Sequence, residues 1–200
     1  MSGPLRDPVD VFRPTTIRFL SCLLAGACLL ASCSLGNSNH YINSKLGYEI
    51  TGPSGWVMIP SKEQTTVQFR KYKGNRDDNA IIRVDVELGN PYGPSLLDFA
   101  EQGIYKQMKY YFETEEQVTV EPRLAPFTVE RNGRPWGTVS FYADYHKLFV
   151  YFVTMEDDFV FIVSLETSGQ LKSRDEQVFL KALDSLVIYK RDRKNVFLQK

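Results

Sequence analysis

The chain carries few side chains that could serve as a catalytic nucleophile together with its base. Histidine, the usual base, occurs only at His40 and His146. His146 lies where two strands are expected to turn, a place that favours a solvated histidine over a catalytic one. Ser54 stands in a Gly-Pro-Ser-Gly turn that lacks the spacing of a nucleophile elbow. We therefore predict no catalytic residue, and we expect the protein not to be an enzyme.

Acidic and amide side chains gather at two predicted turns, residues 75–79 (Asn-Arg-Asp-Asp-Asn) and residues 156–158 (Glu-Asp-Asp). Oxygen ligands of this kind suit a hard cation such as Ca²⁺. Neither segment has the alternate spacing and the distal glutamate of a calcium-binding loop. Aspartate and asparagine are also favoured in turns by their own backbone hydrogen bonds. We expect no metal site and no bound cofactor.

The other carboxylates and the glycines form no recognisable reactive site. Glu113, Glu115, Glu116 and Glu121 cluster on a link after a predicted helix, whereas glycoside hydrolysis needs two carboxylates that face each other across a cleft. The glycine-containing segment 89–93 has no lysine where a phosphate-binding loop requires one. We interpret the glutamates as solvated, and we predict no nucleotide chemistry.

The cysteine with the clearest chemical signal is Cys33, which follows Leu30-Ala31-Ser32. Three arginines precede an apolar run of 13 residues from Phe19 to Ala31. A positive leader, an apolar segment and a small-residue cleavage site are the parts of a secretory signal. Leu-Ala-Ser-Cys resembles the lipobox of bacterial lipoproteins. The resemblance implies cleavage after residue 32, a diacylglycerol thioether on Cys33 and acylation of its new amino group, for example with palmitate.

Other interpretations of this segment remain open. A retained transmembrane anchor needs about 20 apolar residues, more than this run provides. Cys28 is a second candidate for lipidation, although Ala25-Gly26-Ala27 lacks the large aliphatic residue that Leu30 places before Cys33. The third cysteine, Cys22, would leave with the signal, as would Cys28. The processed chain would then have no free thiol, which argues against a disulfide framework, a cysteine nucleophile and a thiolate metal site.

The charge of the processed chain points to no polyanionic partner. Residues 1–32 hold three of the 24 basic and two of the 24 acidic side chains, so the remainder is nearly neutral. Nucleic-acid binding normally shows a basic stripe or a high domain pI, and we expect none. Residues 190–200 form a basic tail that begins Lys190-Arg191-Asp192-Arg193-Lys194. This tail could touch anionic lipid, but a solvated, frayed end is the favoured interpretation.

The pattern along the chain indicates one domain behind a short linker. Residues 33–45 are small and polar and are expected to be a lipidated flexible tether. Residues 46–189 have the usual size of one domain with a single core. The first half predicts strands over residues 47–51, 56–59, 66–71 and 80–88. A helix over about 96–112 follows, capped by Ser95 and Asp98, and Gly103 within it could permit a close approach to a sheet.

The second half predicts an antiparallel meander and a closing helix. Strands are expected at residues 118–121, 127–131, 137–145, 148–155 and 159–166, with a hairpin turn at Asn132-Gly133. Residues 149–153 and 159–163 are apolar on both faces, as central strands covered by helices would be. Ser173 and Glu176 suggest the cap of the last helix. The fold class is therefore α+β, with an antiparallel sheet of six to eight strands covered by helices.

The order of these elements resembles the PsbP-like fold. The resemblance rests on Gly47-Tyr48-Glu49-Ile50 leading into Pro53-Ser54-Gly55-Trp56, then a Ser95-initiated helix, the hairpin meander, and a last helix that ends Asp184-Ser185-Leu186. It covers residues 46–189. The family includes extrinsic photosystem subunits, a nuclear-import factor and bacterial envelope lipoproteins. The resemblance implies a binding or assembly module arranged as an α/β/α sandwich.

Exposed aromatic side chains are the candidates for a docking surface. Tyrosine and tryptophan are favoured at interfaces because they bury much area and keep a polar end. The candidates are Tyr92, Tyr105, Tyr110 and Trp136, and core packing is the alternative for each of them.

Three function classes follow from these observations. The first is a lipid-anchored envelope protein that binds another protein, of unspecified identity, or helps an assembly. The second is a small-ligand binder that uses a cleft between helix and sheet, and the third is a hydrolase or metal-dependent enzyme. Ser34 is not the aspartate that often retains lipoproteins at the inner membrane, so the periplasmic face of the outer membrane is favoured if the source is Gram-negative.

Overall fold

A seven-stranded antiparallel sheet forms the centre of the fold. The computed structural model describes residues 39–71, 79–168 and 171–189. The strand order in the large sheet is β3-β4-β5-β9-β8-β7-β6, with every neighbouring pair antiparallel. Its strands are β3 (Val57–Pro60), β4 (Thr66–Lys71), β5 (Ala80–Leu88), β6 (Val120–Arg131), β7 (Arg134–Ala143), β8 (Lys147–Glu156) and β9 (Phe159–Ser168).

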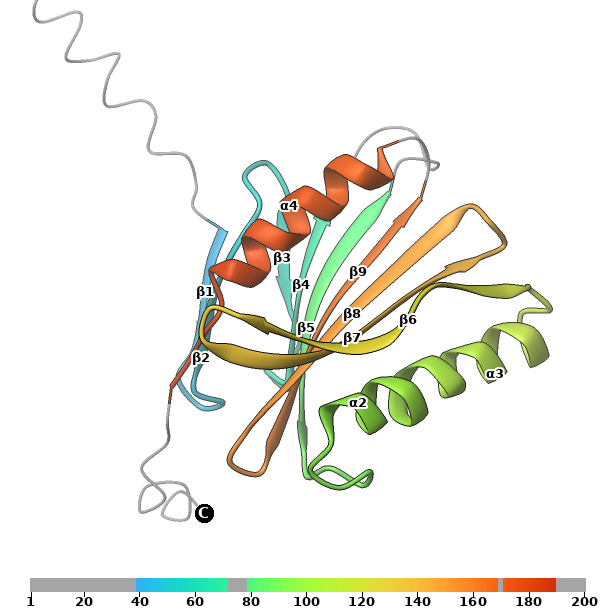
Figure 1. The fold of residues 1–200 in the computed structure, drawn as a ribbon. Helices are drawn as coiled ribbons and strands as arrows, with labels where there is room; N and C mark the ends of the chain where they lie inside the picture. Colours follow the sequence, from blue (N-terminus) through green and yellow to red (C-terminus); the bar gives the residue numbers. More distant parts are fainter. Residues whose placement is uncertain (1–38, 72–78, 169–170, 190–200) are drawn as a thin grey trace, which may run out of the picture. The chain divides into compact units, whose positions relative to one another are not determined.

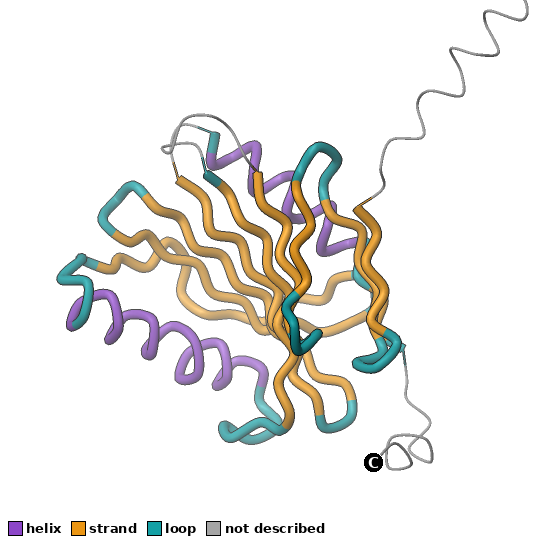
Figure 2. The backbone as a smooth tube through the Cα atoms, turned by 180° about the vertical axis from the view of Figure 1, so that it is seen from behind, coloured by secondary structure: helices purple, strands orange, loops and turns teal. Residues whose placement is uncertain are grey.

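A second, three-stranded sheet lies beside the first. It has the order β1-β2-β10 and consists of β1 (Asn39–Asn43), β2 (Tyr48–Gly52) and β10 (Val187–Ile188). The helices are α2 (Leu96–Asp98), the π-helical η3 (Phe99–Tyr105), α3 (Lys106–Thr114) and α4 (Lys172–Asp184). Figures 1 and 2 show that α4 covers the strands on one side and that the continuous helix from α2 to α3 covers them on the other side.

The large sheet buries apolar side chains on both faces. One cluster joins residues of β2 and α4, such as Ile50 and Phe179, to the inner residues of the large sheet, such as Phe152. The other cluster joins Phe99 and Phe112 of the long helix to Phe149 and its neighbours. Successive side chains of a strand point to opposite faces. The doubly apolar strands β8 and β9 therefore lie in the middle of an α/β/α sandwich, as the sequence predicted.

The long helix starts as predicted but is not a regular α-helix. The backbone N–H of Asp98 donates to the hydroxyl of Ser95, the N-cap, over 3.1 Å. Residues 99–105 then adopt the π form, which is rare and usually confined to one turn. A Cβ on Gly103 would lie 2.7 Å from the ring of Tyr92, so this glycine accommodates an aromatic ring and not the sheet. The close approach to the sheet occurs at Gly137, next to the carbonyl of Leu96.

The strands of the meander differ from the prediction in one place. Residues 118–121 and 127–131 were expected to be separate strands, but one long strand, β6, runs through both. Its pairing with β7 shifts register between Pro122 and Leu124 and again between Leu124 and Phe127. Proline has no N–H for the ladder and is tolerated at an edge strand or a bulge. The prolines therefore interrupt the pairing without ending the strand.

The start of the fold and the start of the last helix also differ from the sequence prediction. Asn39–Asn43 forms β1, paired with β2, so the flexible tether expected over residues 33–45 is wrong for residues 39–43. Residues 33–38 lie outside the described residues. The last helix is capped at Leu171 without a side-chain hydrogen bond, so the expected cap at Ser173 is wrong, because Ser173 lies inside the first turn. The hairpin at Asn132-Gly133 is confirmed, with positive φ at both residues.

Candidate functional site

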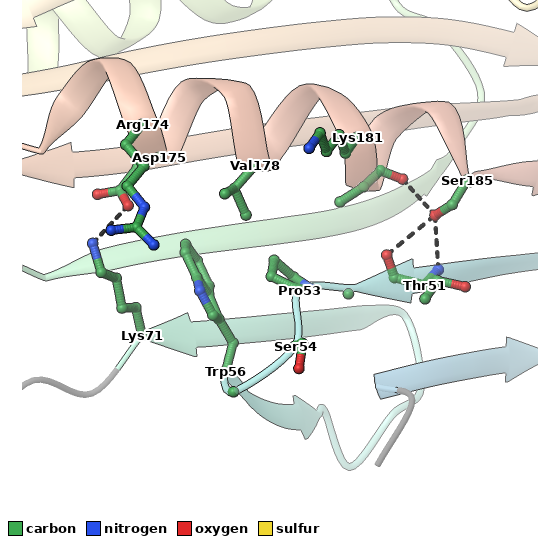
Figure 3. Close-up of a pocket in the computed structure, with 13 residues that line it drawn as sticks. Thr51, Pro53, Ser54, Trp56, Lys71, Arg174, Asp175, Val178, Lys181 and Ser185 are labelled. Atoms are coloured by element: carbon green, nitrogen blue, oxygen red, sulfur yellow. Dashed lines mark hydrogen bonds and ion pairs between the residues drawn. The ribbon is translucent and has the colours of Figure 1, made fainter. Parts of the chain in front are cut away.

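A groove of about 560 Å³ lies between α4 and the turn that joins β2 to β3. The turn contributes residues 52–56, the end of β4 contributes Lys71, and α4 contributes the side facing them (Figure 3). The segments that build it lie far apart in the sequence, so the groove exists only when the two sheets and the last helix have assembled.

The turn side of the groove is held by Asn39 at the start of β1. The side-chain amide of Asn39 donates to the carbonyl of Pro53 over 2.7 Å and to the carbonyl of Trp56 over 2.6 Å. Asparagine has two N–H donors on its side-chain nitrogen, so one residue satisfies both ends of the turn. The turn backbone is therefore fixed by the first described residue of the chain.

The far end of the groove is closed by Ser185, which follows α4. Its hydroxyl accepts from the N–H of Thr51 over 2.9 Å and donates to the carbonyl of Ala182 over 2.6 Å. This contact ties the end of the helix to the end of β2, and Figure 3 shows it at the opposite end from Lys71. The serine in the predicted Asp-Ser-Leu ending thus has a structural role.

The other end of the groove contains a buried ion pair. Lys71 Nζ lies 2.6 Å from Asp175 Oδ1, and the two side chains are 11% and 3% exposed. The second carboxylate oxygen of Asp175 accepts from the hydroxyl of Thr167 over 2.9 Å. Asp175 is the one carboxylate among the described residues that line the groove. Both of its oxygens are engaged, so it is not available as a general base.

Two further cations stand on the groove side of α4. Arg174 and Lys181 are exposed, and within the part of the chain that the structure describes neither of them makes an ion pair or a hydrogen bond. Between them Val178 points toward the turn that carries Pro53 and Trp56 (Figure 3). The groove therefore combines an apolar floor with unpaired positive charge on its rim. Such a site can bind an anionic group that carries an apolar neighbour.

The residues proposed for a docking surface do not come together. Trp136 is 3% exposed and packs against Phe152, so it belongs to the core and the expectation that it forms a surface is wrong. Tyr92 and Tyr105 are half-buried against the cluster under the long helix. Tyr110 alone of the four is well exposed, at 67%. Trp136, Tyr92 and Tyr105 pack on the core because each of them projects from the side of its segment that faces the core.

The polar residues considered for chemistry are also dispersed. His40 lies in β1, where a ring nitrogen is 3.0 Å from the hydroxyl of Thr51, and His146 is exposed in the turn between β7 and β8. Glu156 accepts from Arg134 over 2.7 Å. Among the described residues no three His, Cys, Asp or Glu side chains are grouped as metal ligands would be. Residues 75–78, Cys33 and the basic tail lie outside the described residues.

The glutamates after the long helix bind different partners. Glu116 accepts from the hydroxyl of Tyr111 over 2.7 Å, and Glu121 accepts from that of Tyr145 over 2.8 Å. Glu113 lies 3.5 Å from Lys109. These carboxylates do not face each other across a cleft.

In the described part of the chain, no helix combines the length and the apolar character needed to cross a bilayer.

Sequence reasoning found the elements around the groove but not the groove itself. Trp56 was noted as part of a turn, and a cleft between helix and sheet was one of the hypotheses. Taken singly, Lys71, Arg174 and Lys181 carried no signal, because isolated basic residues on a strand end and a helix are ordinary solvated positions. Charged residues seven positions apart on the last helix were the one available hint.

The fold is shared with known structures. The solution structure of CyanoP, the cyanobacterial PsbP of Synechocystis, is similar with a TM-score of 0.58 and 19% identity, covering 78% of this chain and 95% of that chain. The Ran-binding protein Mog1p of Saccharomyces cerevisiae is similar with a TM-score of 0.51 and 11% identity, over 77% of this chain and 96% of its own. Neither the protein families nor the curated proteins give a match. The described domain has a PsbP-like α+β fold.

Proposed function

We propose that this chain is an exported lipoprotein, anchored through Cys33, whose PsbP-like domain is a non-catalytic module that binds a protein partner. The observation that carries the proposal is the groove between α4 and the β2–β3 turn. Its described lining residues form an apolar floor with cations that have no ion-pair partner among the described residues, and they include no histidine or cysteine. A site of this composition suits binding better than acid–base or nucleophilic chemistry.

The anchor and the groove are close together along the chain. Cys33 precedes Asn39 by six positions, a distance that an extended chain spans in at most about 20 Å. Asn39 in turn holds the turn that forms one wall of the groove. A lipid on Cys33 would therefore keep the groove near the membrane surface, where it would meet membrane proteins or other envelope components.

The shape of the groove favours a protein segment over an enclosed small molecule. Ser54 and Gly55 on one wall and Arg174 and Lys181 on the other are exposed, so the site is open along its length. Small-molecule sites usually bury most of the ligand surface. Mog1p, a fold neighbour, is a Ran-binding protein, which supports the use of this architecture for protein binding.

A small anionic ligand is the second candidate. The volume of about 560 Å³ lies within the usual range of about 300–1,000 Å³ for small-molecule sites. The two functions differ in what a membrane extract would yield, because only the first leads to a crosslinked protein.

The test is a crosslinking pull-down from membranes that compares the native protein with Cys33→Ala. We expect the native protein to carry lipid at Cys33 by mass spectrometry and to recover one defined protein, and we expect Cys33→Ala to lose or weaken that recovery. An unprocessed leader on the native protein contradicts the anchor. Correct acylation with no specific partner contradicts the protein-binding function and favours the small ligand. Where the cell has an outer membrane, we expect the protein on its periplasmic face.

A further inference from the structure

We infer that the groove recognises an acidic peptide segment, in which two carboxylates about 10 Å apart bind Arg174 and Lys181 and an apolar side chain between them packs on Trp56 and Val178. The inference rests on the proposed protein-binding function and names the chemistry of the partner. It concerns a linear segment of the partner, because the groove is open at the surface along the helix.

The spacing of the two cations follows from the helix. Arg174 and Lys181 are seven positions apart on α4, which is two turns and a rise of about 10 Å along one side of the helix. Val178 lies between them on the same side and lines the groove. The side chains thus present a charge, an apolar surface and a second charge in a row.

In the part of the chain that the structure describes, the positive charge of this row is not neutralised by neighbouring acids. Asp175 is bound to Lys71 and Thr167. Glu176 accepts from Arg123 over 2.7 Å, on another side of the helix. These carboxylates are therefore occupied, and among the described residues Arg174 and Lys181 have no ion-pair partner that an incoming carboxylate would have to displace.

The acid at the end of α4 is occupied as well. Asp184 accepts from the guanidinium of Arg131, over 2.7 Å at its Oδ2 atom. A ligand carboxylate at Lys181 consequently meets no competing ion pair from the last turn of the helix. Each such contact between exposed groups is weak, so recognition needs both cations together with the apolar floor.

The floor distinguishes a peptide from a bare anion. Trp56 is half-buried and packs against the core with its ring below the helix, and Pro53 and Val178 continue the apolar surface. A peptide in the polyproline II conformation has three residues per turn and advances about 3.1 Å per residue, so two acidic residues separated by two others lie on one side of the peptide and span about the distance between the cations. One of the intervening side chains then reaches the floor, which a lipid phosphate or free phosphate leaves uncovered.

Tryptophan fluorescence of the full chain, purified from membranes in detergent, reports on this site. The chain has two tryptophans, and Trp136 is buried in the core at 3% exposure. A change in emission on binding therefore comes from Trp56. The probe is a synthetic peptide with two glutamates separated by a leucine and a glycine, and its control is the same peptide with glutamines.

The matched protein variants are Arg174→Ala with Lys181→Ala, and Lys45→Ala with Lys62→Ala. Both pairs remove two exposed positive charges, but Lys45 and Lys62 lie outside the groove. We expect the acidic peptide to give a saturable change, the groove variant to weaken its Kd at least tenfold, and the control variant to leave Kd within twofold. Circular dichroism melting checks that both variants are folded.

Several results would overturn the inference. They are equal binding of the glutamine peptide, an equal loss in both double variants, no saturable change with the acidic peptide, and displacement of the peptide by inorganic phosphate or phosphatidylglycerol vesicles at matched charge. The inference and the proposed function fail separately. A Cys33-dependent partner whose recovery is unchanged by the groove variant overturns only the inference. Peptide binding by the groove in a native protein whose leader is unprocessed contradicts only the lipid anchor of the proposed function.

Discussion

The ammonium of Lys71 and the carboxylate of Asp175 lie 2.6 Å apart in a nearly buried ion pair that joins β4 to the first turn of α4. Thr167 of β9 donates to the same carboxylate. Three elements thus meet at one carboxyl group, and Lys71 of β4 is 104 positions away from Asp175 in the sequence. The position of α4, and with it the row of groove cations on that helix, depends on this contact.

Replacing Asp175 tests the contribution of this pair to stability. Asp175→Ala leaves the buried ammonium of Lys71 without its partner, so we expect the free energy of unfolding to fall by about 3–5 kcal/mol. The double variant Lys71→Met with Asp175→Leu removes both charges, and we expect it to regain most of that loss. Urea unfolding followed by circular dichroism measures both. A loss below about 1 kcal/mol in Asp175→Ala would show that the pair is not needed to hold α4.

Asn39 gives a test of how the groove wall is positioned. Asn39→Ala removes the donors to the carbonyls of Pro53 and Trp56, and we expect about 0.5–1.5 kcal/mol less stability for each lost hydrogen bond. The emission of Trp56 should shift to longer wavelength as the turn loosens. Ser44→Ala, in the exposed turn after β1, is the control and should change neither property. Unchanged emission in Asn39→Ala would contradict the positioning role.

The outline of the fold was predictable because local patterns decided it. Strict alternation marked β5, the Asn-Gly pair marked the β6–β7 hairpin, and Ser95 marked a helix start. The prediction that β8 is covered on both faces is also confirmed, since Phe149 and Phe152 belong to different apolar clusters. These features depend on residues that are close together in the chain.

The features that depend on tertiary contacts were not predictable in the same way. Trp136 looked like an interface residue, but its strand turns that ring into the core. β1 looked like a linker because its side chains are polar, yet its backbone pairs with β2. The groove needs a turn, a strand end and a helix that meet only in the folded chain. The spacing of residues within a single segment does not predict that these three elements lie side by side.

Asp85 of β5 gives a pH-dependent test of a half-buried carboxyl in the large sheet. Burial raises the pKa of the Asp85 carboxyl above its ordinary value, while the hydrogen bond from Thr66, 2.7 Å long, and the charge of Arg83 lower it. A raised pKa means that the folded state favours the protonated form. The contribution to stability is then complete at low pH and is lost as the pH rises through the folded pKa.

Asp85→Asn is therefore expected to melt at a higher temperature than the native protein at pH 7. The amide oxygen can still accept from Thr66, and the charged form no longer has to be buried. The advantage should shrink as the pH falls toward about 4, the ordinary pKa of aspartate. Melting curves from pH 3.5 to 8 measure the difference, and an advantage that grows at low pH would contradict the assignment.

Gly137 gives a test of the helix–sheet approach. A Cβ at this position would collide with the backbone carbonyl of Leu96, the first residue of α2. A backbone atom cannot rotate away, so we expect Gly137→Ala to cost about 1–3 kcal/mol of stability. Gly55→Ala is the comparison, because it has open space and only a positive φ of 78°, and we expect a loss of about 1 kcal/mol there. Equal losses would argue against a tight approach at Gly137.

The most direct test of the central claim is site-specific photo-crosslinking in living cells, with a photoreactive amino acid at Ser54 in the groove or at Lys62 outside it. Both positions are exposed. We expect Ser54 to capture one protein, Lys62 to capture none, and the capture at Ser54 to be lost in the Arg174→Ala, Lys181→Ala background. The same protein captured from both positions, or capture at Ser54 that is unaffected by loss of the two cations, would contradict a partner held in this groove.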